Sequence, residues 1–83
     1  MQEFEISLHS FQEVQEFMAL AAGQGFPVMV GSDAHQANAR SLMSMMTLDY
    51  REPLRVQADC DAEAFSRFRQ QADKFLSTSN TAL

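Results

Sequence analysis

The sequence lacks several features that define common classes of protein: paired cysteines, a long apolar segment and a cluster of basic residues. Its 83 residues contain no tryptophan, one cysteine, two prolines and three glycines. A single cysteine, Cys60, excludes an internal disulfide and, without companions, a cysteine metal site. No apolar run approaches the length of a membrane span, and the first residues lack the pattern of a signal peptide. We therefore expect a cytoplasmic protein with no membrane contact, no metal and no other cofactor.

Basic residues are also scarce. No lysine or arginine precedes Arg40, and the formal net charge of the chain is −5. The later basic residues alternate with acidic ones and do not gather on one segment, which excludes the basic face that nucleic-acid binding needs. The apolar content of 46% is ordinary for a globular protein. These properties predict one small folded domain over 1–76, followed by a flexible tail over 77–83.

Four short strands are predicted over 4–8, 26–30, 35–39 and 54–58. In the first and the last, apolar and polar residues alternate, as they do in a strand with one buried face. Three helices are predicted between and after them. Ser10 and Glu13 form a capping box for the first, Ser41 opens the second, and Asp59 or Asp61 caps the third. The apolar stripe of the third helix consists of Phe65, Phe68, Ala72, Phe75 and Leu76.

The resulting order, β-α-β-β-α-β-α, predicts an α+β fold. We expect a two-layer, open-faced sandwich in which three helices cover one face of an antiparallel four-stranded sheet and the other face is solvated. The residues expected to be buried are Phe4, Ile6, Val14, Phe17, Val28, Val56, Phe65, Phe68 and Phe75, because each lies on the apolar face of its element.

The segment 38–48 carries the strongest functional signal. Ser41 precedes a short helix in which five apolar residues surround the axis, so the helix cannot bury all of them. The serine is either an ordinary helix cap or a site where a phosphate would meet the free N–H groups of the first turn. The methionines are either core filling or a flexible contact surface.

This segment resembles the second-helix region of HPr, the small phosphocarrier of the bacterial sugar phosphotransferase system. The specific part is Ala39-Arg40-Ser41-Leu42-Met43 with Met46. The resemblance implies that Ser41 corresponds to a regulatory serine that a kinase phosphorylates, with Arg40 within reach of the phosphate. It also implies that Leu42, Met43 and Met46 form a patch that docks on partner proteins, whereas Met45 and Leu48 point inward.

The carrier site of the family departs from its pattern here. HPr proteins place a histidine at the start of the first helix in a pattern close to Leu-His-Thr-Arg-Pro. This chain has Leu8-His9-Ser10-Phe11-Gln12-Glu13, without the arginine and the proline. His9 matches the carrier histidine in this comparison, while spacing counted back from Phe17 puts Ser10 at that position. Because a helix bearing Glu13 and Glu16 without a cation repels phosphate, we interpret the carrier site as degenerate.

The sequence thus predicts an HPr-like regulatory protein, not an enzyme, with Ser41 and His9 as its candidate phosphorylation sites. By resemblance its partners are phosphotransferase-system components, an HPr kinase or a transcription regulator. One alternative is a working phosphocarrier that uses His9. Another is a ferredoxin-like ligand-binding or assembly module in which Ser41 is only a cap. His35 has no partner at metal-binding spacing and is expected to be an exposed strand residue.

Overall fold

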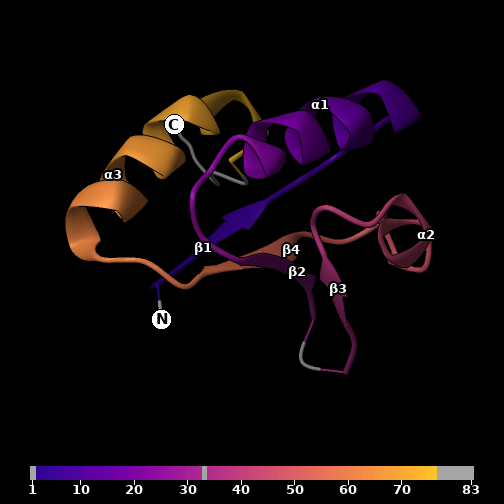
Figure 1. Cartoon of the computed structure of the whole chain (residues 1–83). Helices are drawn as coiled ribbons and strands as arrows, with labels where there is room; N and C mark the ends of the chain where they lie inside the picture. The colour runs from indigo at the N-terminus through magenta and orange to yellow at the C-terminus, as the bar shows by residue number, and fades with distance from the viewer. Residues whose placement is uncertain (1, 33, 77–83) are drawn as a thin grey trace.

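The computed structural model describes residues 2–32 and 34–76 of the chain, and the predicted tail over 77–83 lies outside them. It has an α+β fold with four strands and three helices (Figure 1). In chain order the elements are β1 (Gln2–Ile6), α1 (Phe11–Ala22), β2 (Val28–Gly31), β3 (Gln36–Asn38), α2 (Leu42–Met45), β4 (Leu54–Ala58), α3 (Ala62–Gln71) and a 3-10 turn, η1 (Asp73–Phe75). Within the described ranges, every helix is too short or too polar to cross a membrane.

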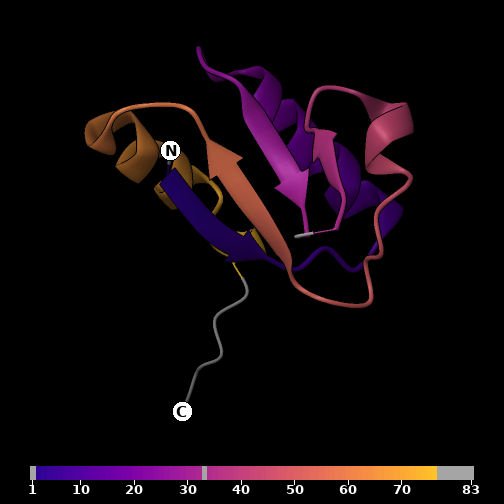
Figure 2. The same ribbon diagram turned by 90° about the horizontal axis from the view of Figure 1, so that it is seen from below.

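The four strands form one sheet in the order β1, β4, β2, β3, and all neighbouring strands are antiparallel (Figure 2). The last strand in sequence therefore pairs on both sides, with Val56 opposite Phe4 of β1 and Val30 of β2. The β2–β3 hairpin is closed tightly, and a Cβ on Gly31 would lie 2.1 Å from the carbonyl oxygen of His35. Only glycine fits at this close approach.

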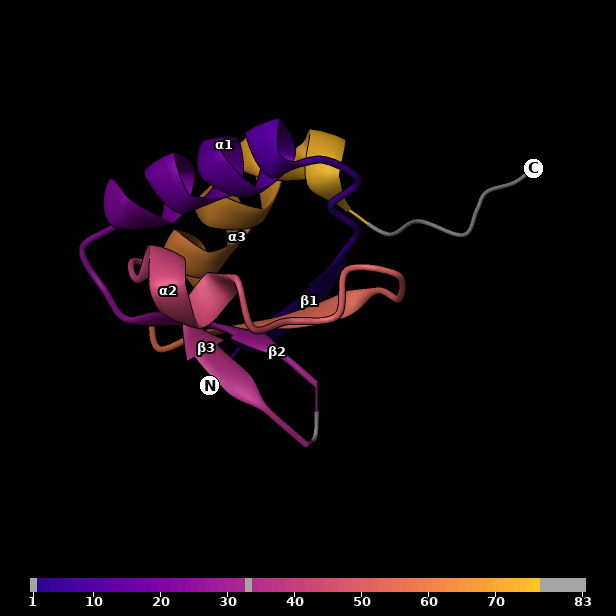
Figure 3. The same cartoon turned by 90° about the vertical axis from the view of Figure 1, so that its right-hand side faces the viewer.

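The two faces of the sheet differ. Helices α1 and α3 lie over one face (Figures 1 and 3), where the inward residues of β1, Phe4 and Ile6, are buried. On the other face Glu3 and Glu5 are exposed and Gln57 of β4 is half-buried. Strand alternation thus separates a helix-covered layer from a polar surface, as the alternating sequence predicts. The short helix α2 lies beside β3 at the edge of the sheet (Figure 3).

An aromatic cluster forms the centre of the core. Phe68 of α3 is fully buried, and its ring centroid lies 5.5 Å from that of Phe4, 6.1 Å from that of Phe17 and 5.7 Å from that of Phe26. Eight of the nine residues predicted to be buried are buried. The ninth, Phe65, is half-buried because it packs at the margin of the cluster, 5.6 Å from Phe4.

The C-terminal element differs from the predicted single helix. α3 begins after the cap Asp61, whose side chain accepts a hydrogen bond from the Ala64 N–H, but it ends at Gln71. A 3-10 turn then brings Phe75 into the core, and Leu76 pairs with Ile6 at the outer edge of β1. The apolar stripe therefore continues from the α-helix into the 3-10 turn. Hydrophobic periodicity alone does not show where one backbone conformation ends and the other begins.

Candidate functional site

Ser41 caps α2 as predicted. Its side-chain oxygen accepts a hydrogen bond from the Ser44 N–H at 3.3 Å, and the Ser41 residue is half-buried. The turn before it is fixed locally, because Asn38 accepts from the Arg40 N–H through its side chain at 2.8 Å and from the Ser41 N–H through its carbonyl at 2.9 Å. This turn connects β3 directly to the cap, so the position of the serine is set by the edge strand of the sheet.

The apolar residues of α2 and its C-cap divide into an exposed and a buried set. Leu42 is 43% exposed, Met43 84% and Met46 57%, whereas Met45 is fully buried. Leu48, which follows the helix, packs against the core. The exposed trio, here called the α2 patch (Leu42, Met43 and Met46), confirms the predicted exposure of these three side chains. Such a patch is a feature of protein contact sites.

Tyr50 fixes the buried side of α2. Its hydroxyl donates a hydrogen bond to the Met45 carbonyl, which lies at the open C-terminal end of the helix. Partial burial raises the pKa of the Tyr50 hydroxyl, so it stays protonated and remains a donor. The sequence does not predict this contact, because Tyr50 lies in a loop five residues after Met45 and belongs to no periodic pattern.

Arg40, next to the capping serine, is held by backbone carbonyls of the loop after α1. Its guanidinium donates to the carbonyl oxygen of Gln24 at 2.7 Å and contacts that of Phe26 at 3.4 Å. Gln24 in turn donates through its side chain to the Leu20 carbonyl and to Gln71 of α3, both at 3.0 Å. Arg40 therefore joins the start of α2 to the loop after α1. A phosphate on Ser41 would have to compete with these carbonyls for the guanidinium.

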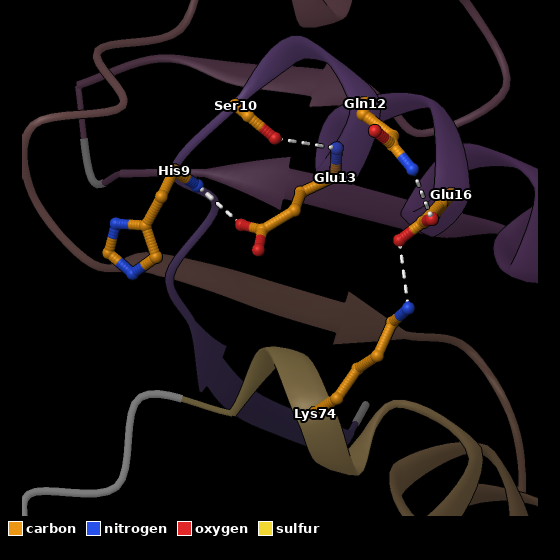
Figure 4. A network of polar contacts seen from close by, with 6 residues as sticks. All are labelled: His9, Ser10, Gln12, Glu13, Glu16 and Lys74. Atoms are coloured by element: carbon orange, nitrogen blue, oxygen red, sulfur yellow. Dashed lines mark hydrogen bonds and ion pairs between the residues drawn. The ribbon is translucent and has the colours of Figure 1, made fainter.

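The N-terminus of α1 contains both candidate carrier residues, His9 and Ser10 (Figure 4). The capping box forms, with Ser10 Oγ accepting from the Glu13 N–H at 3.1 Å and the Glu13 carboxylate accepting from the His9 N–H at 2.6 Å. His9 is exposed, and its imidazole points away from the Glu13 carboxylate in Figure 4. The first turn of α1 therefore already holds one carboxylate beside the backbone of His9.

The face of α1 carries a cation that the sequence does not show. Lys74 Nζ lies 2.8 Å from Glu16 Oε1, and Gln12 donates to the other carboxylate oxygen at 3.2 Å (Figure 4). The bond from Lys74, and secondly that from Gln12, holds the pKa of Glu16 below its usual value. The expectation of an acidic face without a cation is therefore wrong for Glu16, because η1 brings Lys74 across from a distant part of the sequence. Of the two glutamates that α1 was expected to present, Glu16 is paired with Lys74, and no ion pair to Glu13 is found among the described residues.

His35 is exposed as predicted, but it lies just outside the strand in which it was expected, immediately before β3. Its Nε2 atom lies 2.7 Å from Thr47 Oγ1. Cys60 is half-buried between β4 and α3, and the pKa of its thiol is raised by burial and then by the neighbouring Asp61 and Asp59. In the described part of the chain, no group of three histidine, cysteine or acidic side chains is arranged to hold a metal ion.

Sequence comparisons add no relatives to this description. No protein-family model matches the sequence, and no curated protein matches it. The function is therefore inferred from the geometry of Ser41, the α2 patch and the first turn of α1.

Proposed function

We propose that this chain is an HPr-like cytoplasmic protein of bacterial sugar transport or carbon regulation, which acts through protein contacts around Ser41 and has a degenerate carrier site. The observation that carries the proposal is the α2 patch beside a half-buried capping serine. Two of the four helix residues, Leu42 and Met43, and the C-cap Met46 expose apolar side chains, whereas Met45 alone of this set is buried in the core. A phosphate on Ser41 would place about two negative charges next to them.

The fold supports the same proposal. The order β-α-β-β-α-β-α, the antiparallel sheet and the polar outer face are those expected of an HPr-like, open-faced sandwich. In this account the protein is not an enzyme, and its partners are phosphotransferase-system components, an HPr kinase or a transcription regulator. The kinase would have to approach Ser41 across the α2 patch, because the patch follows the serine directly in the chain.

The test of the proposal is phosphorylation by a purified HPr kinase with ATP. We expect one phosphate per chain, located on Ser41 by peptide mass spectrometry and absent from Ser41→Ala. Ser44→Ala is the matched control, because Ser44 contributes only its backbone N–H to the cap and keeps it in the variant. A phosphate that survives Ser41→Ala, or no phosphate on the wild type, contradicts the proposal.

We further expect little acid-labile phosphate after incubation with the general phosphotransferase enzyme and phosphoenolpyruvate. The first turn of α1 already holds the Glu13 carboxylate, bonded to the His9 backbone N–H, and a phosphorylated His9 would lack the arginine that the family pattern supplies. Acid-labile labelling measured over time checks this expectation. Rapid, stoichiometric labelling that disappears in His9→Ala would instead establish the alternative function, a working phosphocarrier.

A further inference from the structure

A pocket of 310 Å³ lies between the β2–β3 hairpin and the loop that leads from α2 to β4, and its lining includes no residue of the α2 patch. Its polar lining consists of Ser32 and His35 from the hairpin and Thr47, Asp49 and Glu52 from the loop. The volume is at the lower end of the range for small-molecule sites. Nothing in the proposed function uses this pocket, so its chemistry can be considered independently.

The hydrogen bonds around Thr47 determine what His35 can offer a ligand. The Thr47 hydroxyl donates its single proton to the Ser44 carbonyl at 2.6 Å. A carbonyl oxygen only accepts, so His35 Nε2, 2.7 Å from Thr47 Oγ1, must be the donor in that second contact. The neutral imidazole therefore carries its proton on Nε2 and keeps the unshared pair on Nδ1, which makes it a hydrogen-bond acceptor.

The two carboxylates of the lining are acceptors as well. Asp49 receives three hydrogen bonds from Arg51, two from the guanidinium and one from the backbone N–H, each 3.0 Å long, and these bonds lower the pKa of the Asp49 carboxyl to about 2. Asp49 is therefore ionised at neutral pH and also holds Arg51. Glu52 is exposed, and its charge, after that of Asp49, helps to raise the pKa of Arg51. Neither lysine nor arginine lines the pocket.

The apolar part of the lining comes from Leu48, which packs against the core, and from Leu54, which is buried in it. The pocket thus combines an acceptor-rich, negatively charged wall with a small apolar surface. A ligand that fits this wall must bring positive charge and N–H donors. Arg51 neutralises Asp49, so an anion would be repelled chiefly by Glu52, while a bare metal ion lacks the required group of ligands in the described structure.

We propose that this pocket binds a small primary alkylammonium compound. Its ammonium group offers three N–H donors and no acceptor, which complements Glu52, Asp49 and His35 Nδ1. Its short alkyl part would cover the apolar surface of Leu48 and Leu54. The β2–β3 hairpin and the loop from α2 to β4 would hold this ligand, so binding does not require Ser41 or the α2 patch.

The test is a titration of the ¹⁵N-labelled full chain with propylammonium, followed by NMR. We expect saturable shifts at the amides of Ser32, His35, Thr47 and Glu52. Propionate, of opposite charge, and tetramethylammonium, a cation without N–H donors, should produce neither saturation nor this pattern. In Glu52→Gln the affinity for propylammonium should fall about tenfold, since a charge-assisted hydrogen bond is lost.

Glu63→Gln is the matched control, because it removes the same charge from an exposed position on α3. Its affinity should equal that of the wild type. The proposal is overturned if propylammonium causes no saturable shifts, if tetramethylammonium binds equally well, or if Glu63→Gln weakens binding as much as Glu52→Gln. All of these outcomes are independent of kinase labelling at Ser41.

Discussion

Replacing Phe68 by alanine is expected to lower the free energy of unfolding by about 3–5 kcal/mol. Phe68 is fully buried, and its ring contacts aromatic rings from β1, from α1 and from the segment before β2. Truncation therefore opens a cavity where three parts of the chain meet, and neighbouring rings cannot collapse into it without losing their own contacts. For so small a domain this loss is comparable with its whole stability.

Urea denaturation followed by circular dichroism measures the change. Phe11→Ala is the matched control, because Phe11 is 50% exposed at the start of α1, so its truncation should cost less than about 1 kcal/mol. If Phe68→Ala and Phe11→Ala unfold at the same urea concentration, the aromatic cluster does not hold the helices on the sheet.

The second large effect is expected at the α2 patch. Met46→Glu should weaken binding to a phosphotransferase-system partner or to an HPr kinase at least about tenfold, because a desolvated charge would enter an apolar contact. Met46 is 57% exposed, so stability should change by less than about 0.5 kcal/mol. Titration of the purified partner by calorimetry measures the affinity.

Met46→Lys separates an apolar contact from simple electrostatics. Met46 is the C-cap residue of α2, where a lysine is favourable and a glutamate unfavourable for the helix. If the patch is an apolar contact, both variants lose affinity despite their opposite charges. If Met46→Lys binds as well as the wild type, the contact depends on charge and the patch is not its apolar centre.

The sequence predicts the local elements of this fold well, because their signals are local. The caps Ser10 and Ser41 lie where hydroxyl oxygens can accept from the N–H groups of a first turn. That some apolar residues in and beside α2 stay exposed follows from the short length of the helix. These inferences need only spacing along the chain and the number of residues that one helix can bury.

Besides the early end of α3, what the sequence misses are contacts between distant parts of the chain. Lys74 reaches Glu16, and Arg40 reaches the carbonyls of the loop after α1, because of how the elements are arranged in space. Hydrophobic periodicity does not predict which distant group a long, flexible side chain will contact. The pocket beside His35 is likewise not predictable from the sequence, since two separate loops form it and its acceptor pattern depends on the bond to Thr47.

The most direct test of the regulatory role of Ser41 compares partner capture by the wild type, Ser41→Asp and Ser66→Asp, with circular dichroism of all three. Ser66 is an exposed serine of α3 and controls for added charge. We predict the same spectra for the three proteins, and a changed set of captured partners for Ser41→Asp alone. If Ser41→Asp captures the same partners as the wild type, Ser41 is only a helix cap and the proposed regulation is wrong.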